Sequence, residues 1–474
     1  MKILLTGATG YIGKRLLPVL VEEGHTVICC VRDINRFNPP DSLKSKIEVI
    51  EVDLLDQDSL KKIPKDIDGA YYLVHSMSNS GDYDKLEKLS AINFRFAINK
   101  TNLKHLIYLS GIINEVKLSK HLNSRRNVEI ELRNGKYNFT TLRAGIIIGE
   151  GSSSFEIIRD LVEKLPLMIT PKWLSTKSQP IGVTDVIDFL YKSLFNNKTY
   201  GSNFDIGGPD VLSYKEILLK FANIRNLKRK IFIVPVMTPR LSSYWLYFVT
   251  SISYKLSIAL VNSMKVEVIC RDNELERILN IETEKLEVSL EKAFSKIENN
   301  QIISSWKDSL ISGNMDMNIS DFINVPIFGC FKDTREESYD NLEGCLDRVW
   351  RIGGATGWYC GDWLWKIRGF IDKIFGGVGL RRGRTNEIEL CAGDAVDFWR
   401  VLYANKNEGR LLLFAEMKLP GEAWLEFKIH ENKLIQTATF RPIGLLGRIY
   451  WYCVLPFHSY IFNGMLLNLT KEKL

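Results

Sequence analysis

The fold of this chain is decided by residues 2–13, KILLTGATGYIG. The apolar run at its start predicts a buried strand, and a helical pattern begins at Tyr11. Between them, Gly7 allows a tight turn, Gly10 lets the backbone approach a pyrophosphate, and Gly13 lets the helix lie close to the sheet. A turn with a purely structural role is the alternative. The residues predicted to bind a dinucleotide here are Gly7, Thr9, Gly10, Tyr11, Ile12 and Gly13.

Short apolar runs alternate with helical patterns through the first 145 residues. The predicted strands are Lys2–Leu5, Thr26–Val31, Ile47–Val52, Ala70–His75, Leu106–Leu109 and Phe139–Leu142. The predicted helices start near Tyr11, Ser59, Tyr83 and His121, each long enough for a crossover. This alternation predicts an α/β fold, a doubly wound parallel Rossmann sheet, with a small substrate lobe over residues 155–300.

The residues that end the next three strands are predicted to contact the cofactor. At the end of the second strand, an acid would accept hydrogen bonds from the ribose of NAD, whereas Arg32 favours the 2′-phosphate of NADP. We therefore predict NADP, with NAD as the alternative because Asp33 follows directly. Asp53 and Leu54 are predicted to flank the adenine, or to begin a helix. His75 is predicted to face the nicotinamide, or to cap the sheet.

Composition excludes several classes of protein. The 474 residues are 45% hydrophobic and 25% charged, which is typical of a globular chain rather than a disordered one. The net charge of +7 arises in the first 300 residues, without a run of five basic residues, so we predict an anionic small molecule and no nucleic acid as partner. The eight cysteines form no CxxC pair, and no histidine stands at metal-ligand spacing. We therefore predict reduced thiols, a cytoplasmic location and no metal site.

Further motifs identify a family resemblance. The turn Thr6–Gly13, Asp53-Leu54 and the strand running into His75-Ser76-Met77 are followed by LRAGIIIG at residues 142–149 and QPIGVTDV at residues 179–186. Together they resemble an atypical, extended short-chain dehydrogenase/reductase of the NmrA-like kind over about 300 residues. The resemblance implies an NAD(P)-binding domain that covers residues 1–300.

The resemblance also implies a catalytic serine at the end of the fifth strand and a Tyr-x-x-x-Lys pair on the next helix. Ser110 matches the serine, but His121 and Arg125 stand at the positions of the pair. Their i, i+4 spacing places both on one helical face. A neutral His121 suits a general acid or base, and Arg125 suits a ribose or phosphate but cannot give a proton. The alternative is that both are surface residues and that the site only binds nucleotide.

A serine-rich segment, Gly151–Phe155, precedes the first predicted helix of the substrate lobe. Hydroxyls and amides at a helix N-terminus suit an oxyanion or a phosphate of the substrate. Simple capping of the helix by a serine is the alternative.

The last part of the chain has a different composition. A polar stretch over residues 301–325 predicts a linker, and eight of the ten tryptophans lie beyond residue 300. Strand-like runs at Phe398–Tyr403, Leu411–Met417, Ala423–His430 and Leu434–Phe440 are flanked by helices near Trp363–Phe375 and after Gly447. Residues 326–474 therefore resemble the α+β helix-grip, START-like fold, which implies a hydrophobic small molecule as ligand. A solid aromatic core is the alternative.

The apolar stretch Ile449–Leu467 has two interpretations. Its length is just enough to span a bilayer, but Pro456 interrupts it and a polar stripe runs along it, so we predict a helix that closes over the module. Peripheral contact of this helix with a membrane stays open.

These features leave three functional hypotheses. The first is an NADP-dependent oxidoreductase that transfers hydride to or from an apolar carbonyl or alcohol. The second is a non-catalytic NADP(H)-binding sensor or ligand-binding protein, since the tyrosine and lysine are absent. The third is an enzyme similar to nucleotide-sugar epimerases and dehydratases. The sequence does not determine the oligomeric state.

Overall fold

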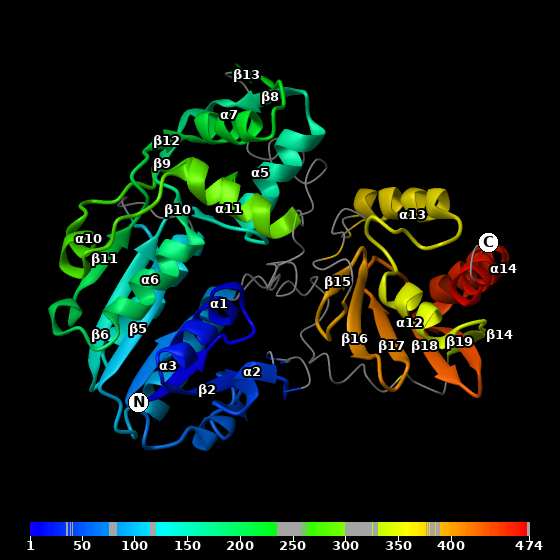
Figure 1. Cartoon of the computed structure of the whole chain (residues 1–474), viewed down its shortest axis with the longest axis horizontal. Coiled ribbons are helices and arrows are strands. Elements are labelled where there is room, and N and C mark those ends of the chain that lie inside the picture. The colour runs from blue at the N-terminus through cyan, green and yellow to red at the C-terminus, as the bar shows by residue number, and fades with distance from the viewer. Residues whose placement is uncertain are drawn as a thin grey trace. The chain divides into compact units, whose positions relative to one another are not determined.

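The computed structural model describes residues 1–34, 37, 39, 41–74, 83–113, 120–234, 258, 261–262, 264–298, 325, 330–375, 377, 379, 384 and 389–471. The chain divides into two compact units, and their border along the sequence falls between residues 310 and 311 (Figure 1). The predicted linker, residues 301–325, lies almost entirely outside the described residues.

The first unit is built on a seven-stranded parallel sheet with the strand order β11-β6-β5-β4-β1-β2-β3 (Figure 1). Its strands are β1 (Lys2–Thr6), β2 (Thr26–Val31), β3 (Ile47–Glu51), β4 (Gly69–Tyr72), β5 (His105–Gly111), β6 (Asn138–Ala144) and β11 (Asn203–Ile206). Strands β1 and β2 are almost continuously apolar and buried, as expected of a parallel sheet covered on both faces. The predicted doubly wound sheet is confirmed.

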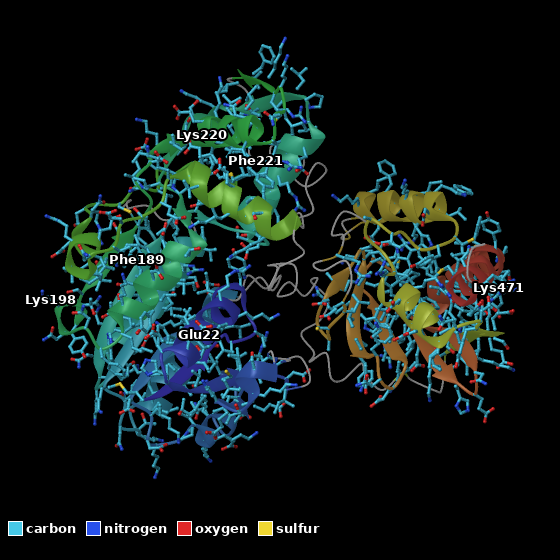
Figure 2. All side chains as sticks on the ribbon, viewed as in Figure 1. Glu22, Phe189, Lys198, Lys220, Phe221 and Lys471 are labelled. Carbon is cyan, nitrogen blue, oxygen red and sulfur yellow. The ribbon has the colours of Figure 1, made fainter. Side chains whose placement is uncertain are left out.

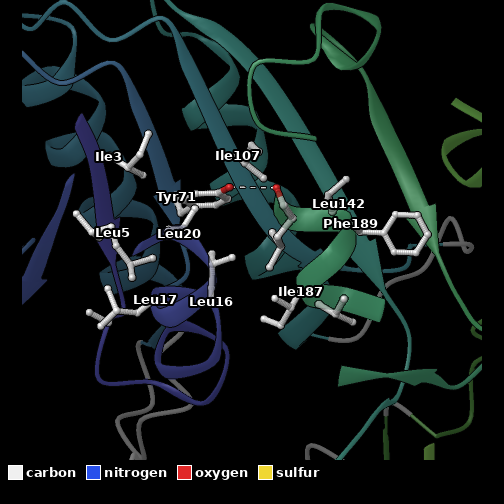
Figure 3. Close-up of a cluster of buried hydrophobic side chains, with 14 of the residues drawn as sticks. Ile3, Leu5, Leu16, Leu17, Leu20, Tyr71, Ile107, Leu142, Ile187 and Phe189 are labelled. Atoms are coloured by element: carbon white, nitrogen blue, oxygen red, sulfur yellow. Dashed lines mark hydrogen bonds between the residues drawn. The ribbon is translucent and has the colours of Figure 1, made fainter. Parts of the chain in front are cut away.

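Helices cover both faces of this sheet. The helices are α1 (Tyr11–Glu22) and α6 (Val183–Ser193) on one face and α3 (Tyr83–Ile98) and α4 (Lys120–Arg133) on the other. Figure 3 shows the core on the α1 and α6 face, where the Tyr71 hydroxyl donates a hydrogen bond to the Leu190 carbonyl at 3.1 Å. In Figure 2, the buried residues Phe189 and Phe221 lie within the first unit, whereas Lys198 lies at its outer edge.

The link between β3 and β4 differs from the prediction. The segment from Ser59 forms only a short 3-10 helix, η2 (Ser59–Lys62), instead of a crossover helix. Polar turns precede it, because Asp53 and Asp56 each accept a hydrogen bond from a backbone N–H two residues later. Pro64 follows directly and cannot continue a helix.

A small lobe extends the first unit beyond β6. It contains the paired strands β7 with β10, β8 with β13 and β9 with β12. Their bounds are β7 (Ile147–Ile148), β8 (Leu167–Pro171), β9 (Lys177–Ser178), β10 (Ile181–Gly182), β12 (Leu212–Ser213) and β13 (Lys230–Val234). Its helices are α5 (Ser153–Lys164), α7 (Tyr214–Ile224) and α11 (Leu286–Glu298), with α10 (Glu274–Leu279) beside β11. Rings of Phe155, Phe221 and Phe294 pack together between α5, α7 and α11.

The second unit is a six-stranded antiparallel sheet with the order β14-β19-β18-β17-β16-β15. Its elements are β14 (Phe331–Ser338), α12 (Leu342–Trp350), α13 (Asp362–Ile374), β15 (Ala395–Val396), β16 (Trp399–Asn405), β17 (Arg410–Ala415), β18 (Gly421–His430), β19 (Lys433–Pro442) and α14 (Gly444–Thr470). The predicted meander and closing helix are confirmed as elements, and α14 packs against β14 and β19. Within the described ranges, no helix has the length and apolar character that crossing a bilayer requires.

Candidate functional site

The glycine-rich turn follows β1 directly and has the geometry that its sequence predicts. Gly7 has φ +73°, and a Cβ there would lie 2.8 Å from the Leu73 carbonyl oxygen. A Cβ on Gly13 would lie 2.2 Å from the Gly7 carbonyl oxygen, so the first turn of α1 packs directly on the loop. The Gly10 N–H closes the turn by donating to the Gly7 carbonyl oxygen at 2.9 Å. Larger residues at these positions would displace backbone.

The start of α1 is open to an anion. Gly10 is the N-cap residue, no side chain caps the helix, and its first turn contains no acidic residue. The first backbone N–H groups of a helix lack partners within it, and the helix dipole favours negative charge there. The turn therefore fits the pyrophosphate of a dinucleotide.

The position of the turn in the sheet supports this fit. Strand β1 lies between β2 and β4, where the chain switches from one half of the sheet to the other. Ligands of open parallel sheets bind at the carboxyl ends of the strands at such a switch point. Arg32 comes directly after β2 and is exposed, whereas the adjacent Asp33 is buried. His75 lies outside the described residues.

Asp53 and Leu54 have local structural partners. The Asp53 carboxylate accepts a hydrogen bond from the Leu55 N–H at 2.9 Å, and the Asp53 backbone binds the Ser59 hydroxyl. Leu54 is buried in the core on the α3 and α4 face. These contacts fix the turn after β3, and the predicted contact with adenine stays a prediction.

Two of the three candidate catalytic residues, Arg125 and Ser110, lie at the carboxyl end of β5. Arg125, on α4, donates from Nη1 to the Leu109 carbonyl oxygen at 3.2 Å, next to Ser110. The side chain of Ser110 is buried, and its hydroxyl makes no hydrogen bond to any residue that the structure describes. His121 lies in α4, but its side chain is not among those described. The structure thus brings Arg125 and Ser110 to one edge of the sheet.

Tyr108 lies on the same face of β5 as Ser110, as strand alternation predicts. Its phenol donates to the Arg125 carbonyl oxygen at 3.4 Å, and its ring packs edge-on against Tyr72. Burial raises the pKa of Tyr108 to about 12, although nearby Arg125 favours the phenolate. Tyr108 is therefore protonated at neutral pH and belongs to the core.

The structure also reveals a buried ion pair that the sequence analysis did not single out. The Arg15 guanidinium, on α1, lies 2.6 Å from the Glu150 carboxylate, and both side chains are buried. Arg15 also lies over the Tyr11 ring, 3.9 Å from its centroid, and donates to the Tyr11 carbonyl oxygen. The pair joins the helix of the glycine-rich turn to the start of the lobe. The available signal was the i, i+4 spacing of Tyr11 and Arg15 on one face of this helix.

Two other polar residues at the lobe have structural roles. Ser152 caps α5 by accepting from the Phe155 N–H at 3.2 Å, which is the alternative given for Gly151–Phe155. Asp185, in the QPIGVTDV motif, accepts from the Glu284 N–H at 3.1 Å, and burial raises the pKa of its carboxyl to about 6. In the described part of the chain, no cluster of His, Cys, Asp or Glu is arranged to hold a metal.

Comparison with known proteins finds a family match in each unit. Residues 7–170 match a family of NAD(P)H-binding domains, and residues 331–465 match a family of proteins of unknown function. The match in the first unit agrees with its Rossmann-type parallel sheet and is in line with the resemblance to atypical short-chain dehydrogenases/reductases. The family matched by residues 331–465 has no assigned function, so this match does not identify the second unit as START-like.

Individual relatives are distant. Divinyl chlorophyllide a 8-vinyl-reductase of Arabidopsis thaliana is 22% identical over 46% of this chain and 57% of its own length. The chain spans only 3% to 57% of the first four curated relatives that it matches. A nucleoside-diphosphate-sugar epimerase of Staphylococcus aureus has a TM-score of 0.52 at 16% identity, covering 61% of this chain and 99% of the epimerase. Triphenylmethane reductase of Citrobacter sp., complexed with NADP(H), has a TM-score of 0.51 at 15% identity, covering 62% of this chain and all of the reductase.

Proposed function

We propose that the first unit is an NADP-dependent oxidoreductase acting on an apolar carbonyl or alcohol. The observation that carries the proposal is the turn at residues 7–13, where glycines are required by contact and the start of α1 lacks a cap. Exposed Arg32 after β2 supports the preference for NADP, because a guanidinium pairs well with a 2′-phosphate. Reductases among the similar proteins support reduction as the class of reaction.

The chain's own residues have distinct roles in this proposal. Bound cofactor supplies or accepts the hydride. Arg125, held at the end of β5 by the Leu109 carbonyl, orients a ribose or phosphate group. His121 gives a proton to the substrate oxygen during carbonyl reduction, or takes it during alcohol oxidation, and Ser110 positions that oxygen.

NADPH oxidation with a panel of apolar ketones, comparing the wild type with His121→Ala, tests this proposal. Turnover that His121→Ala abolishes, with NADPH binding unchanged, supports the oxidoreductase. Tight NADPH binding without turnover of any ketone favours the alternative of a non-catalytic sensor. Dinucleotide that survives purification, with interconversion of nucleotide sugars, favours the epimerase-like alternative that the Staphylococcus aureus structure suggests.

For the second unit we propose a START-like role in binding a hydrophobic small molecule. The element order β14–α12–α13, then β15 to β19, then α14 supports it, since one long helix packs along an antiparallel sheet. The core cluster that residues of α14 share with the sheet is rich in aromatic residues and includes Trp358, Trp365 and Phe398.

We also propose that this unit touches a membrane surface peripherally, from the cytoplasmic side. Its apolar side chains exposed on α13 and α14 include Trp363, Ile367, Phe370, Ile371, Ile374, Leu446, Ile449, Tyr452, Phe457 and Tyr460. Exposed Lys366 and Arg448 stand among them, which suits anionic headgroups. No disulfide links the eight cysteines, all of which are described, and this supports the cytoplasmic location.

Flotation of the full chain with phosphatidylglycerol vesicles tests this contact. We expect flotation that Phe370→Glu and Tyr460→Glu reduce, while Phe232→Glu, at an exposed aromatic residue of the first unit, does not. Equal flotation of all variants would contradict the proposed contact.

A further inference from the structure

Gln436 has a buried side-chain amide in the second unit. It lies on β19 and is only 1% exposed. Neither its side-chain nitrogen nor its oxygen makes a hydrogen bond to any residue in the described ranges. A buried polar group without a partner loses its hydration and gains nothing in exchange, so it needs an explanation.

The strand register places Gln436 at a boundary between polar and apolar side chains. Gln436 pairs with Arg335 on β14 and with Phe427 on β18, and directly paired residues project from the same face. Leu434 and Ala438, two residues away on β19, share this face and are buried. The surroundings are therefore charged toward β14 and apolar toward β18.

The charges on the β14 side are already satisfied. Arg335 binds both oxygens of Asp333, at 2.9 and 3.0 Å. The same guanidinium reaches α14, where it donates to the Asn463 side chain and to the Ser459 hydroxyl. The guanidinium is thus bound to the helix and paired with a carboxylate, and it leaves no net charge beside Gln436.

His458 adds a second unmet polar atom on the α14 side. Its Nδ1 is buried and makes no hydrogen bond within the described part of the chain. Its ring packs against Trp451 and Phe462, with centroids 5.1 and 4.7 Å away. Burial lowers the pKa of His458 to about 4, and the Asp333 and Arg335 charges act on it in opposite directions, so it is neutral at pH 7.

We infer that the layer between β19 and α14 binds the hydroxyl group of an apolar alcohol, with Gln436 as its polar anchor. The inference rests on the proposed ligand-binding role of the second unit. A hydroxyl both donates and accepts, so it satisfies the carbonyl oxygen and the NH₂ group of one amide. A ketone leaves the amide oxygen unmet, and a carboxylate meets no uncommitted cation because Arg335 is paired with Asp333. The neighbouring aromatic and aliphatic side chains suit the apolar body.

Access to Gln436 requires local movement of α14. Pro456 lies within this helix, two residues before His458. A proline has no N–H and removes the helical hydrogen bond to the residue four positions earlier. The helix is thus weakened three residues before Ser459, which binds Arg335, the strand partner of Gln436.

Displacement of the fluorescent apolar probe N-phenylnaphthylamine from the full chain tests this inference. We expect n-nonanol to displace the probe at about tenfold lower concentration than methyl heptyl ketone or nonanoate, the effect of one satisfied hydrogen bond. Gln436→Leu should erase this preference while keeping probe binding and folded stability, because it removes an unpaired amide. Thr437→Val, on the opposite face of β19, is the matched control and should keep the preference.

The possible failures are distinguishable. Probe binding without a preference for alcohol, or a preference that persists in Gln436→Leu, overturns the inference and leaves the ligand-binding role intact. A crystal structure grown with n-nonanol that shows only a water molecule at the Gln436 amide also overturns it. No binding of probe to the wild type overturns both the inference and the role on which it rests.

Discussion

The sites proposed in the two units present polar groups in opposite ways. In the first unit, the groups are backbone amides at the carboxyl edge of a parallel sheet, where α1 begins at Tyr11. In the second unit, they are side chains such as Gln436, on the covered face of an antiparallel sheet. The first proposed site depends on glycines that have no side chain, and the second depends on the side chain of Gln436.

This difference follows from the two kinds of sheet. Parallel strands bring their following loops to one edge, so a ligand meets backbone and loop residues there. An antiparallel sheet alternates its side chains between two faces, so a ligand under a covering helix meets every second residue of several strands. Substitutions should accordingly disturb the first site through the backbone and the second through hydrogen bonding alone.

The largest expected effect concerns buried ion pairs, because each unit has one. Arg15–Glu150 lies in the first unit and Arg400–Glu416 in the second, and all four side chains are at most 5% exposed. Glu150→Gln should lower the free energy of unfolding of the first unit by about 3–5 kcal/mol, because it leaves a buried arginine without its carboxylate. Chemical denaturation followed by unit-specific fluorescence measures this.

The double variant Arg15→Met/Glu150→Leu is the control for that effect. Removing both charges should cost less than removing one, because no buried charge is left unpaired. Glu416→Gln should give a loss of similar size in the second unit. A loss below 1 kcal/mol for Glu150→Gln would show that water reaches this pair.

A second comparison concerns two buried histidines, His105 in the first unit and His458 in the second, whose pKa values are both lowered by burial. His105, in β5, accepts from the Phe195 N–H at Nδ1, and its Nε2 lies 2.8 Å from the Thr140 hydroxyl. Burial lowers its pKa from 6.5 to about 4. The unfolded chain therefore takes up a proton at His105 at higher pH than the folded one, and this group alone lowers the stability of the first unit by up to about 3 kcal/mol as pH drops from 6.5 to 4. The raised pKa of Asp185 acts in the opposite direction over this range, so the His105 contribution is measured as the difference between the wild type and a His105 variant.

His105→Gln should remove the His105 contribution, since an amide does not titrate in this range. Imidazole resonances in a proton NMR titration identify the group directly. A His105 resonance that titrates near pH 6.5 in the folded protein would contradict the expected loss.

Binding at the glycine-rich turn should respond to a single methyl group. Gly13→Ala places its Cβ 2.2 Å from the Gly7 carbonyl oxygen, so the loop must move. We expect NADPH affinity to fall about 100-fold, which is about 2.7 kcal/mol, in a fluorescence titration. Gly201→Ala is the control: it has φ +71° but open space around it, so it should cost about 1 kcal/mol of stability and leave NADPH binding unchanged. Equal losses of NADPH affinity in Gly13→Ala and Gly201→Ala would mean that backbone strain alone explains the weaker binding.

The smallest expected effect is the choice between cofactors. Arg32→Ala should weaken NADPH binding about tenfold and leave NADH binding unchanged, because only NADPH carries the 2′-phosphate. Lys198→Ala, at an exposed lysine, controls for the general loss of positive charge. A parallel loss for NADPH and NADH would show that Arg32 acts on the shared part of the dinucleotide.

The backbone site was predictable from the sequence, because its information is local. The apolar run before Gly7 and the helical pattern after Gly13 are adjacent in the chain, and the structure confirms the turn between them. The segment from Ser59 was misassigned because its helical pattern is weak, and polar turns with Pro64 shorten it to η2. Here local turn chemistry prevails over periodicity.

The side-chain contacts were less predictable, because their partners are far apart in the sequence. Arg15 and Glu150 are separated by 135 residues, and no local pattern links them. Gln436 did carry a signal, since it alternates with apolar Leu434 and Ala438 on the buried face of a predicted strand. Whether the Gln436 side chain finds a hydrogen-bond partner depends on its neighbours on β14, β18 and α14. These elements are far apart in the sequence, and only the fold brings them together.

Native mass spectrometry of the gently purified full chain, titrated with NADPH and NADH, tests the central claim most directly. We expect a dinucleotide adduct that forms at lower NADPH than NADH concentration and is lost in Gly13→Ala. An apolar mass retained on the second unit should persist in that variant, because the two sites are separate. Absence of any dinucleotide adduct on the folded wild type would contradict the account.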